Sequence, residues 1–308
     1  MNNFNLYSAT GQADLPIITA NPLLHKKELY EPSPGLQAAV NVALALGQPL
    51  LLTGEPGTGK TELANHLAYF FKLGEPLVFN AQTSSVVRDL FYRYDALAHF
   101  QFAQTQKEPL TNELVEQKFI RYEALGEAIR GGLRRVVLID EIDKAPRDLP
   151  NDVLARIEAL EFDVPEIDRK WLKPTAEQRP LIVITSNSEK NLPDAFLRRV
   201  VFYHIPFPDA TTLLRIVSKK VEGYDDADLK KVIAHFEAIR DEKQLRLRKK
   251  PATAELLQWA FLLKKIDFPV DKLGNLDGLS DAERSKLLLS YSVLAKSKED
   301  IKVLEDWL

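Results

Sequence analysis

Residues 50–61 read LLLTGEPGTGKT and carry the clearest chemistry in the chain. Glycines at 54, 57 and 59 allow a loop to turn successive backbone N–H groups inward, because glycine adopts positive backbone angles at little cost. Lys60 can reach phosphate oxygens as a point charge, and the Thr61 hydroxyl can be a ligand of Mg²⁺. The stretch therefore predicts a loop that binds the phosphates of a nucleotide.

The segments on either side of this loop must hold it in place. Residues 50–53 form an apolar run typical of a buried strand, and apolar residues recur with helical spacing at Leu63, Leu67, Phe70 and Phe71. A helix that begins at the loop adds free N–H groups and partial positive charge. The residues that we expect to hold the nucleotide are Gly54, Glu55, Pro56, Gly57, Thr58, Gly59, Lys60, Thr61 and Glu62.

Two acidic residues follow a second apolar run, in the sequence RRVVLIDEID at residues 134–143. The run at 136–139 predicts a buried strand of a parallel sheet, and ligands of such sheets bind at the carboxyl ends of the strands. We assign Asp140 to Mg²⁺, through its water shell, and Glu141 to orienting the attacking water. A solvated acidic turn after a core strand is the alternative interpretation.

A third apolar run, residues 181–185, ends in Ser186 and Asn187. An amide at a strand end can hold the attacking water or contact the γ-phosphate, so we assign this role to Asn187. An ordinary turn asparagine is the alternative.

The composition excludes several classes of protein. The 308 residues include no cysteine, which excludes disulfides, thiolate catalysis and cysteine-type zinc sites, and five scattered histidines suggest no metal cluster. A formal net charge of −3 disfavours binding of nucleic acid over the whole surface. No signal-peptide pattern or membrane-length apolar run is present, so we expect a cytoplasmic location and no membrane span.

The chain divides by pattern into an N-terminal arm at residues 1–34, an α/β nucleotide-binding core at 35–208 and a helical domain at 209–308. Two stretches are long for connections, and we interpret residues 83–122 and 161–178 as inserts, the second of them a hairpin. In the first insert, residues 88–104 fit a helix with Leu90, Tyr94, Leu97 and Phe100/Gln101 on one face, and a loop is expected after it. In the helical domain we expect helices at 213–221, 229–239, 253–264 and 285–296.

Six motifs follow one another along the chain between about residues 30 and 265: GEPGTGKTELA, LFYRYDALAHF, VVLIDEIDKAPRDLPNDVL, VITSN, LPDAFLRR and KPATAELLQWA. In these motifs the chain resembles the AAA+ ATPases and, more narrowly, their MoxR-type group, which has an insert in helix 2. The resemblance implies an α/β fold, the P-loop NTPase three-layer αβα sandwich with a five-stranded parallel sheet and a C-terminal all-helical lid.

The same resemblance implies what the protein binds. It points to ATP with Mg²⁺, to a homo-oligomeric ring that is commonly hexameric, and to chaperone-like remodelling of a partner protein. Such proteins are commonly encoded beside partners with von Willebrand A domains. In such rings an arginine of the neighbouring subunit completes the nucleotide site, and we assign this finger to Arg199, with Arg198 second. A structural arginine that pairs with acids of its own subunit is the alternative for each.

The lid departs from the family pattern. Related proteins carry an arginine early in a lid helix to contact the γ-phosphate, but the matching position here is Ala254. Either Arg248, Lys249 or Lys250 replaces it, with Lys250 in our set of nucleotide-binding residues, or the contact is absent. The basic stretch 240–250 is a solvated helix face or, as the alternative, a contact for nucleic acid.

Two other functions stay open beside the ATP-driven remodeller. One is a nucleotide-gated binding module in which ATP locks an assembly and slow hydrolysis resets it. The other is a nucleic-acid motor or a GTP-using, restriction-type NTPase, because nothing in the loop sequence decides the base.

Overall fold

The computed structural model describes residues 7, 14, 17, 20–105, 109–187, 192–241, 243 and 245–308. The chain forms two compact units. The sheet unit comprises Pro32–Gly54 and Lys60–Ile205, and the helical unit comprises Glu55–Gly59, Pro206–Leu308 and the described part of Met1–Glu31. The tip of the glycine-rich loop, Glu55–Gly59, therefore groups with the helical unit, while the residues before and after it group with the sheet unit.

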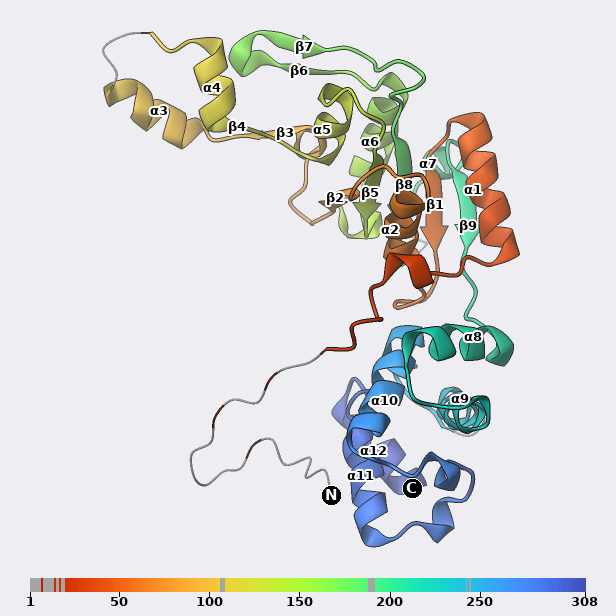
Figure 1. Ribbon diagram of the computed structural model, residues 1–308. Coiled ribbons are helices and arrows are strands. Elements are labelled where there is room, and N and C mark those ends of the chain that lie inside the picture. Colours follow the sequence, from red (N-terminus) through yellow and green to blue (C-terminus); the bar gives the residue numbers. More distant parts are fainter. Residues whose placement is uncertain are drawn as a thin grey trace. The chain divides into compact units, whose positions relative to one another are not determined.

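The sheet unit is built on one five-stranded parallel sheet (Figure 1). In spatial order its strands are β2 (Leu77–Asn80), β5 (Val136–Asp140), β8 (Leu181–Thr185), β1 (Leu50–Thr53) and β9 (Val201–His204). The central strands β1 and β8 are buried along their whole length, whereas the edge strands β2 and β9 are partly exposed. This difference explains the continuous apolar runs of the central strands. The predicted α/β fold with a five-stranded parallel sheet is confirmed.

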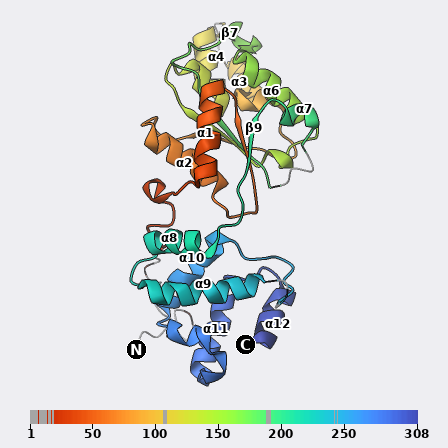
Figure 2. The same ribbon diagram turned by 90° about the vertical axis from the view of Figure 1, so that its right-hand side faces the viewer.

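Helices flank this sheet in both views (Figures 1 and 2). They are α1 (Pro34–Leu46), α2 (Lys60–Phe70), α5 (Ala124–Arg130), α6 (Leu149–Ala159) and α7 (Asp194–Leu197). In α2 the buried stripe consists of Leu63, Ala64, Leu67 and Ala68. Phe70 and Phe71 lie outside this stripe and are exposed, so only Leu63 and Leu67 of the four apolar residues with helical spacing are buried.

The first insert contains η2 (Val87–Leu90), β3 (Tyr92–Tyr94), α3 (Ala96–Thr105), α4 (Asn112–Phe119) and β4 (Ile120–Tyr122). The α-helix predicted over residues 88–104 is therefore present only in its second half, as α3. Strand β3 pairs antiparallel with β4, so that Tyr92 lies opposite Tyr122. Because the partner strand lies about thirty residues further along the chain, the local helical spacing of Leu90, Tyr94 and Leu97 was misleading.

The second stretch contains the antiparallel hairpin of β6 (Phe162–Val164) and β7 (Arg169–Trp171). Its aromatic side chains pack against those of the first insert: the Phe162 ring stacks on Phe91 with centroids 4.9 Å apart, and Trp171 meets Tyr122 edge to face. Burial and a hydrogen bond to Glu166 raise the pKa of Tyr92 to about 12. The two segments therefore share one aromatic core.

The helical unit contains five longer helices among its described residues. They are α8 (Ala210–Lys220), α9 (Asp226–Arg240), α10 (Thr253–Lys265), α11 (Asp281–Tyr291) and α12 (Lys298–Trp307). Three of the four predicted helices match α8, α9 and α10, whereas α11 ends earlier than expected and α12 was not predicted. No helix in the described ranges is long and apolar enough to cross a bilayer.

Candidate functional site

The glycines of the loop have backbone angles that only glycine adopts without strain. Gly54, Gly57 and Gly59 have φ values of +144°, +77° and +88°. Two of them are also closely approached within the helical unit: a Cβ at Gly57 would lie 3.0 Å from Ala252 Cβ, and one at Gly59 would lie 3.1 Å from the Tyr30 ring. Tyr30 comes from the N-terminal arm, to which the sequence patterns assigned no role.

Lys60 is the first residue of α2, and only 7% of it is exposed. Its Nζ donates a hydrogen bond to the Gly54 carbonyl, with N and O 2.8 Å apart. Burial lowers the pKa of Lys60, and the carboxylates of Asp140, Asp143 and Glu141 act in the opposite direction. A desolvated ammonium group next to a glycine-rich loop favours an anionic ligand.

The two predicted magnesium ligands lie together. The Thr61 hydroxyl lies 3.2 Å and 3.3 Å from the two carboxylate oxygens of Asp140. Neighbouring ligands of an octahedral Mg²⁺ stand about 3 Å apart, since each metal–oxygen bond is about 2.1 Å. No group of three or more metal-binding His, Cys, Asp or Glu side chains occurs within the described ranges. The site thus fits an ion that keeps most of its waters.

Thr185, the last residue of β8, connects the two acids. Its hydroxyl donates to Asp140 Oδ1, and its oxygen accepts the backbone N–H of Glu141 at 2.9 Å. Thr185 is 1% exposed, so both contacts are shielded from water. Sequence reasoning missed this residue, although its position at the carboxyl end of a buried strand beside β5 was an available signal.

Glu141 has a left-handed backbone conformation, with φ +55°. Such a conformation costs free energy in a non-glycine residue and often occurs at functional sites. One carboxylate oxygen accepts from Asn187 Nδ2 at 3.1 Å, and the other pairs with Lys144 Nζ. The backbone N–H of Asn187 also donates to Asp143 Oδ1 at 3.1 Å. The structure therefore brings Glu141 and Asn187 together at adjacent strand ends.

The remaining members of the nucleotide-binding set lie along the same segment. Pro56 is exposed in the loop, the Thr58 hydroxyl donates to the Glu55 carbonyl at 2.8 Å, and Glu62 is half-buried in the first turn of α2.

The paired arginines are exposed after α7. Arg199 Nε lies 3.8 Å from Glu158 Oε1, and both side chains are about half exposed, with relative exposures of 49% and 60%. A pair this exposed contributes little to stability. Among the described residues, no hydrogen bond or ion pair links Arg198 or Arg199 to Asp140 or Glu141 of the same chain.

The candidate lid cations differ in their surroundings. Arg248 pairs with Glu299 at 3.4 Å, Lys249 and Lys250 are exposed, and Ala254 lies beside Gly57.

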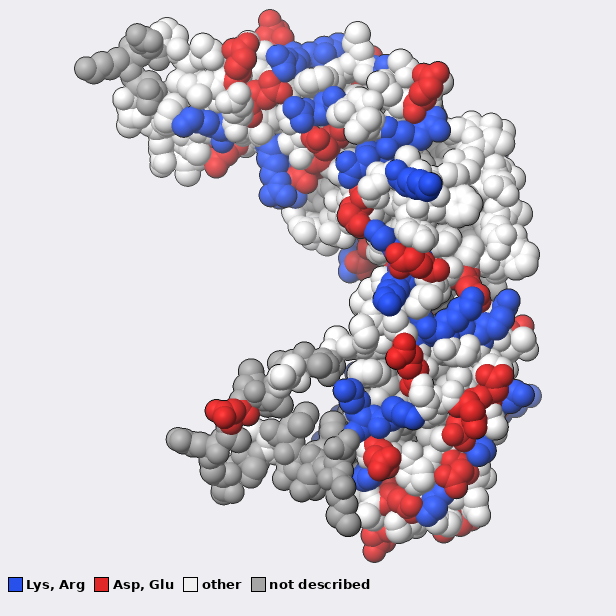
Figure 3. All heavy atoms as spheres, in the orientation of Figure 1, with Lys and Arg blue, Asp and Glu red and all other residues white. Residues whose placement is uncertain are grey.

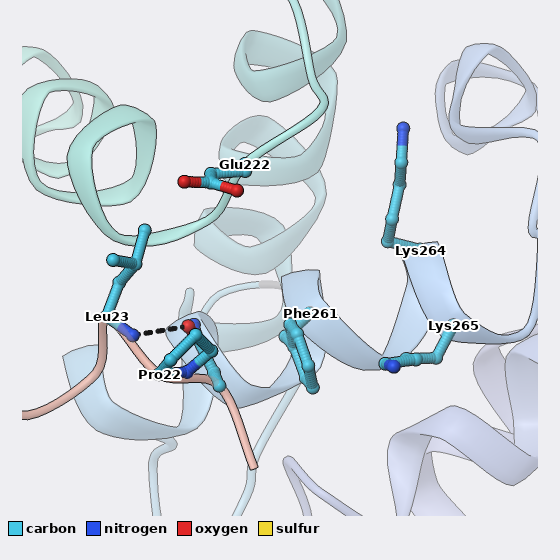
Figure 4. A pocket seen from close by; sticks show the side chains of 7 residues that line it. Pro22, Leu23, Glu222, Phe261, Lys264 and Lys265 are labelled. Carbon is cyan, nitrogen blue, oxygen red and sulfur yellow. Dashed lines mark hydrogen bonds between the residues drawn. The ribbon is translucent and has the colours of Figure 1, made fainter. Parts of the chain in front are cut away.

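A separate pocket of about 320 Å³ lies in the helical unit (Figure 4). Asn21, which accepts the Leu23 N–H, lines it together with Pro22, Leu23, Glu222, Phe261, Lys264 and Lys265. None of these residues belongs to the predicted nucleotide site.

Residues 49–200 match the AAA domain family, dynein-related subfamily. Among solved structures, the AAA domain of FIGL-1 in complex with ADP is similar with a TM-score of 0.45 and 16% identity, over 90% of this chain and 87% of that one. A mutant RuvB of Thermotoga maritima has a TM-score of 0.45 and 15% identity, over 83% of this chain and 73% of that one. No curated protein matches the sequence. Over residues 49–200, which include the glycine-rich loop, Asp140, Glu141 and Asn187, the chain is similar to AAA domains, and its sheet unit has the AAA+ P-loop fold.

Proposed function

We propose that this protein is a MoxR-type AAA+ ATPase that binds and hydrolyses ATP with Mg²⁺. The observation that carries the proposal is the strand-end network, in which Thr61 reaches Asp140 and Thr185 joins Asp140 to Glu141. A hydroxyl, two acids and an amide gathered after a glycine-rich loop are the groups that nucleotide hydrolysis requires.

Each residue has a distinct role in this proposal. Gly54–Gly59 N–H groups and Lys60 hold the phosphates, and Thr61 with Asp140 would hold Mg²⁺, which supplies charge neutralisation at the β- and γ-phosphates. Glu141 accepts a proton from the attacking water and orients it. Asn187, which donates to Glu141 at 3.1 Å, holds that carboxylate or the water in position.

We further propose that the chain works as a homo-oligomeric ring, with Arg199 or Arg198 completing a neighbour's site. An uncharged exposed helix face supports assembly: α1 has no charged residue, and Val42, Leu44 and Leu46 on it are 47%, 41% and 62% exposed. Figure 3 shows this region of the sheet unit free of charge, whereas acidic and basic residues are interspersed over most of the rest of that face. Such an apolar surface fits a second copy of the chain. A partner protein with a von Willebrand A domain and a cytoplasmic location complete the proposal, on the motif resemblance.

The test combines turnover with assembly. ATP hydrolysis should rise cooperatively with protein concentration, and light scattering should show a mass increase with ATP and Mg²⁺. Lys60→Ala should abolish both binding and hydrolysis, whereas Lys72→Ala, at an exposed position two residues after α2, should change neither. A monomer under all conditions would remove the role of Arg199 in a neighbouring site, and absence of ATP binding would remove the proposal as a whole.

A second function has its own support. Both carboxylate oxygens of Glu141 are engaged, by Asn187 and by Lys144, and Ala254 stands where a lid arginine is expected. These features favour a nucleotide-gated module in which hydrolysis is slow. Turnover far below one per minute in the presence of the partner would support this module over the remodeller, while brisk turnover would exclude it.

A further inference from the structure

Arg240, the last residue of α9, differs from the other cations of the stretch 240–250. Its side chain is only 11% exposed, whereas Arg246, Lys249 and Lys250 are exposed. The guanidinium lies over the Phe207 ring, 3.5 Å from its centroid. Arg240 is therefore a packed residue of the helical unit rather than part of a solvated helix face.

The hydrogen bonds of Arg240 join two segments that are far apart in sequence. Nη2 donates to Glu55 Oε2 at 2.9 Å, and Nη1 donates to the carbonyl of Pro251, just before α10. The planar guanidinium suits this arrangement, since it can donate to two acceptors while its face stacks on an aromatic ring. Removing one acceptor would leave a nearly buried charge without its partner.

Glu55 is a residue of the glycine-rich loop itself. It follows Gly54 directly, and the loop continues through Gly57, where the neighbouring atoms in the helical unit are the methyl groups of Ala252 and Ala254 and a carboxylate oxygen of Glu255. The methyl groups cannot bind a charge, and the Glu255 oxygen already accepts the Ala252 N–H. The Arg240–Glu55 pair is thus a charged, directional link between the loop and the end of α9.

We propose that Arg240 is a positioning residue of the phosphate-binding loop, acting through Glu55. It fixes the loop and the start of α10 in one arrangement, so that a shift of the loop on nucleotide binding is transmitted to the Pro251 carbonyl. In this way Arg240 couples the loop to the start of α10, which the methyl group of Ala254 cannot do. This inference rests on the proposed function, because it assumes that the loop binds a nucleotide.

The experiment is a double-mutant cycle with Arg240→Gln, Glu55→Gln and the double variant, using the full-length chain. The readouts are kcat and KM for ATP and, separately, the Kd of ADP with Mg²⁺ by calorimetry. Arg240→Gln is expected to weaken ADP binding and lower kcat/KM about tenfold, and Glu55→Gln should do nearly the same. In the double variant the losses should not multiply. Arg246→Gln is the matched control and should leave every constant unchanged.

Conservative and reversed variants separate positioning from a general effect on folding. Arg240→Lys keeps the charge but loses the two-acceptor geometry, so it should recover only part of the ADP affinity. The exchange Arg240→Glu with Glu55→Arg should recover more affinity than either reversal alone. Multiplicative losses in the double variant, or loss of thermal stability on Arg240→Gln with Glu55→Gln silent, would overturn the inference.

The same measurements test the proposed ATPase activity separately from the role of Arg240. If the unaltered protein binds ADP but does not hydrolyse ATP, the ATPase assignment fails while the ADP cycle still tests Arg240. If hydrolysis is present and the cycle shows no coupling, only the role of Arg240 fails.

Discussion

Two groups of hydrogen-bonded side chains, one in each unit, differ in their exposure to solvent and in their charge. At the strand ends of the sheet unit, Asp140, Glu141, Lys144 and Asn187 are partly or largely exposed and most of them are charged. In the helical unit, His235, Tyr291, Trp259 and Ser290 are buried, and none of them carries a charge at neutral pH.

The two networks differ in whether a ligand can replace their internal hydrogen-bond partners. Trp259 Nε1 donates to Ser290 Oγ at 2.8 Å, and His235 Nε2 and the Tyr291 hydroxyl are 2.8 Å apart, all away from solvent. This network is closed and can only stabilise the fold. The strand-end network is open to solvent, so that a ligand can replace its internal partners. The first network is therefore expected to affect stability, and the second to affect activity.

The largest expected effect is on turnover at the open network. Glu141→Gln should lower kcat about a thousandfold, because the amide cannot accept a proton from water. Binding of ATP should persist, since Lys60 and the loop are unchanged. Single-turnover kinetics and calorimetry measure the two separately, and Glu113→Gln, at an exposed acid of α4, is the control. A variant with unchanged turnover would disprove the role of Glu141.

The closed network should make the protein sensitive to acid. Burial lowers the pKa of His235 from 6.5 to about 4, so the unfolded state binds the extra proton between these pH values. Stability is therefore complete above pH 6.5 and falls as the pH drops toward 4, by up to about 3 kcal/mol. Urea unfolding at a series of pH values measures this. His235→Gln should flatten the dependence, whereas His66→Gln should not; an unchanged slope in His235→Gln would contradict the assignment.

Thr185 tests whether a buried residue can belong to the open network. Thr185→Val keeps the shape but removes the hydrogen bonds to Asp140 and to the Glu141 N–H, so kcat should fall about tenfold. Thr185→Ser should recover most of the activity because it restores the hydroxyl. A loss of stability with normal kcat would place Thr185 with the structural residues instead.

The smallest effect is expected from Tyr291→Phe. It removes one buried hydrogen bond to His235 and should lower the free energy of unfolding by about 1 kcal/mol, with kcat unchanged. Tyr69→Phe, at a half-exposed position of α2, should change neither quantity. Reduced turnover in Tyr291→Phe would show that the two networks are not independent.

The strands and motifs were open to prediction because their signals are local. Strands β1, β5 and β8 are buried on both faces, so each appears in the sequence as an unbroken apolar run, and parallel strands place Asp140 and Asn187 at one edge. The first insert was predicted less well. Leu90, Tyr94 and Leu97 fit a helical spacing, and only the pairing of Tyr92 with Tyr122 and of Tyr94 with Ile120 makes this segment a strand.

By itself the sequence determined the class of fold, the order of its strands along the chain and the types of side chain at each strand end. The tertiary structure alone decided which residues meet: Thr185 with Asp140 and Glu141, the aromatic rings of the two inserts, and Arg240 with Glu55. The physical reason is that burial and backbone preference leave a periodic pattern in neighbouring residues. A hydrogen bond between residues 185 positions apart, as between Glu55 and Arg240, leaves no such pattern.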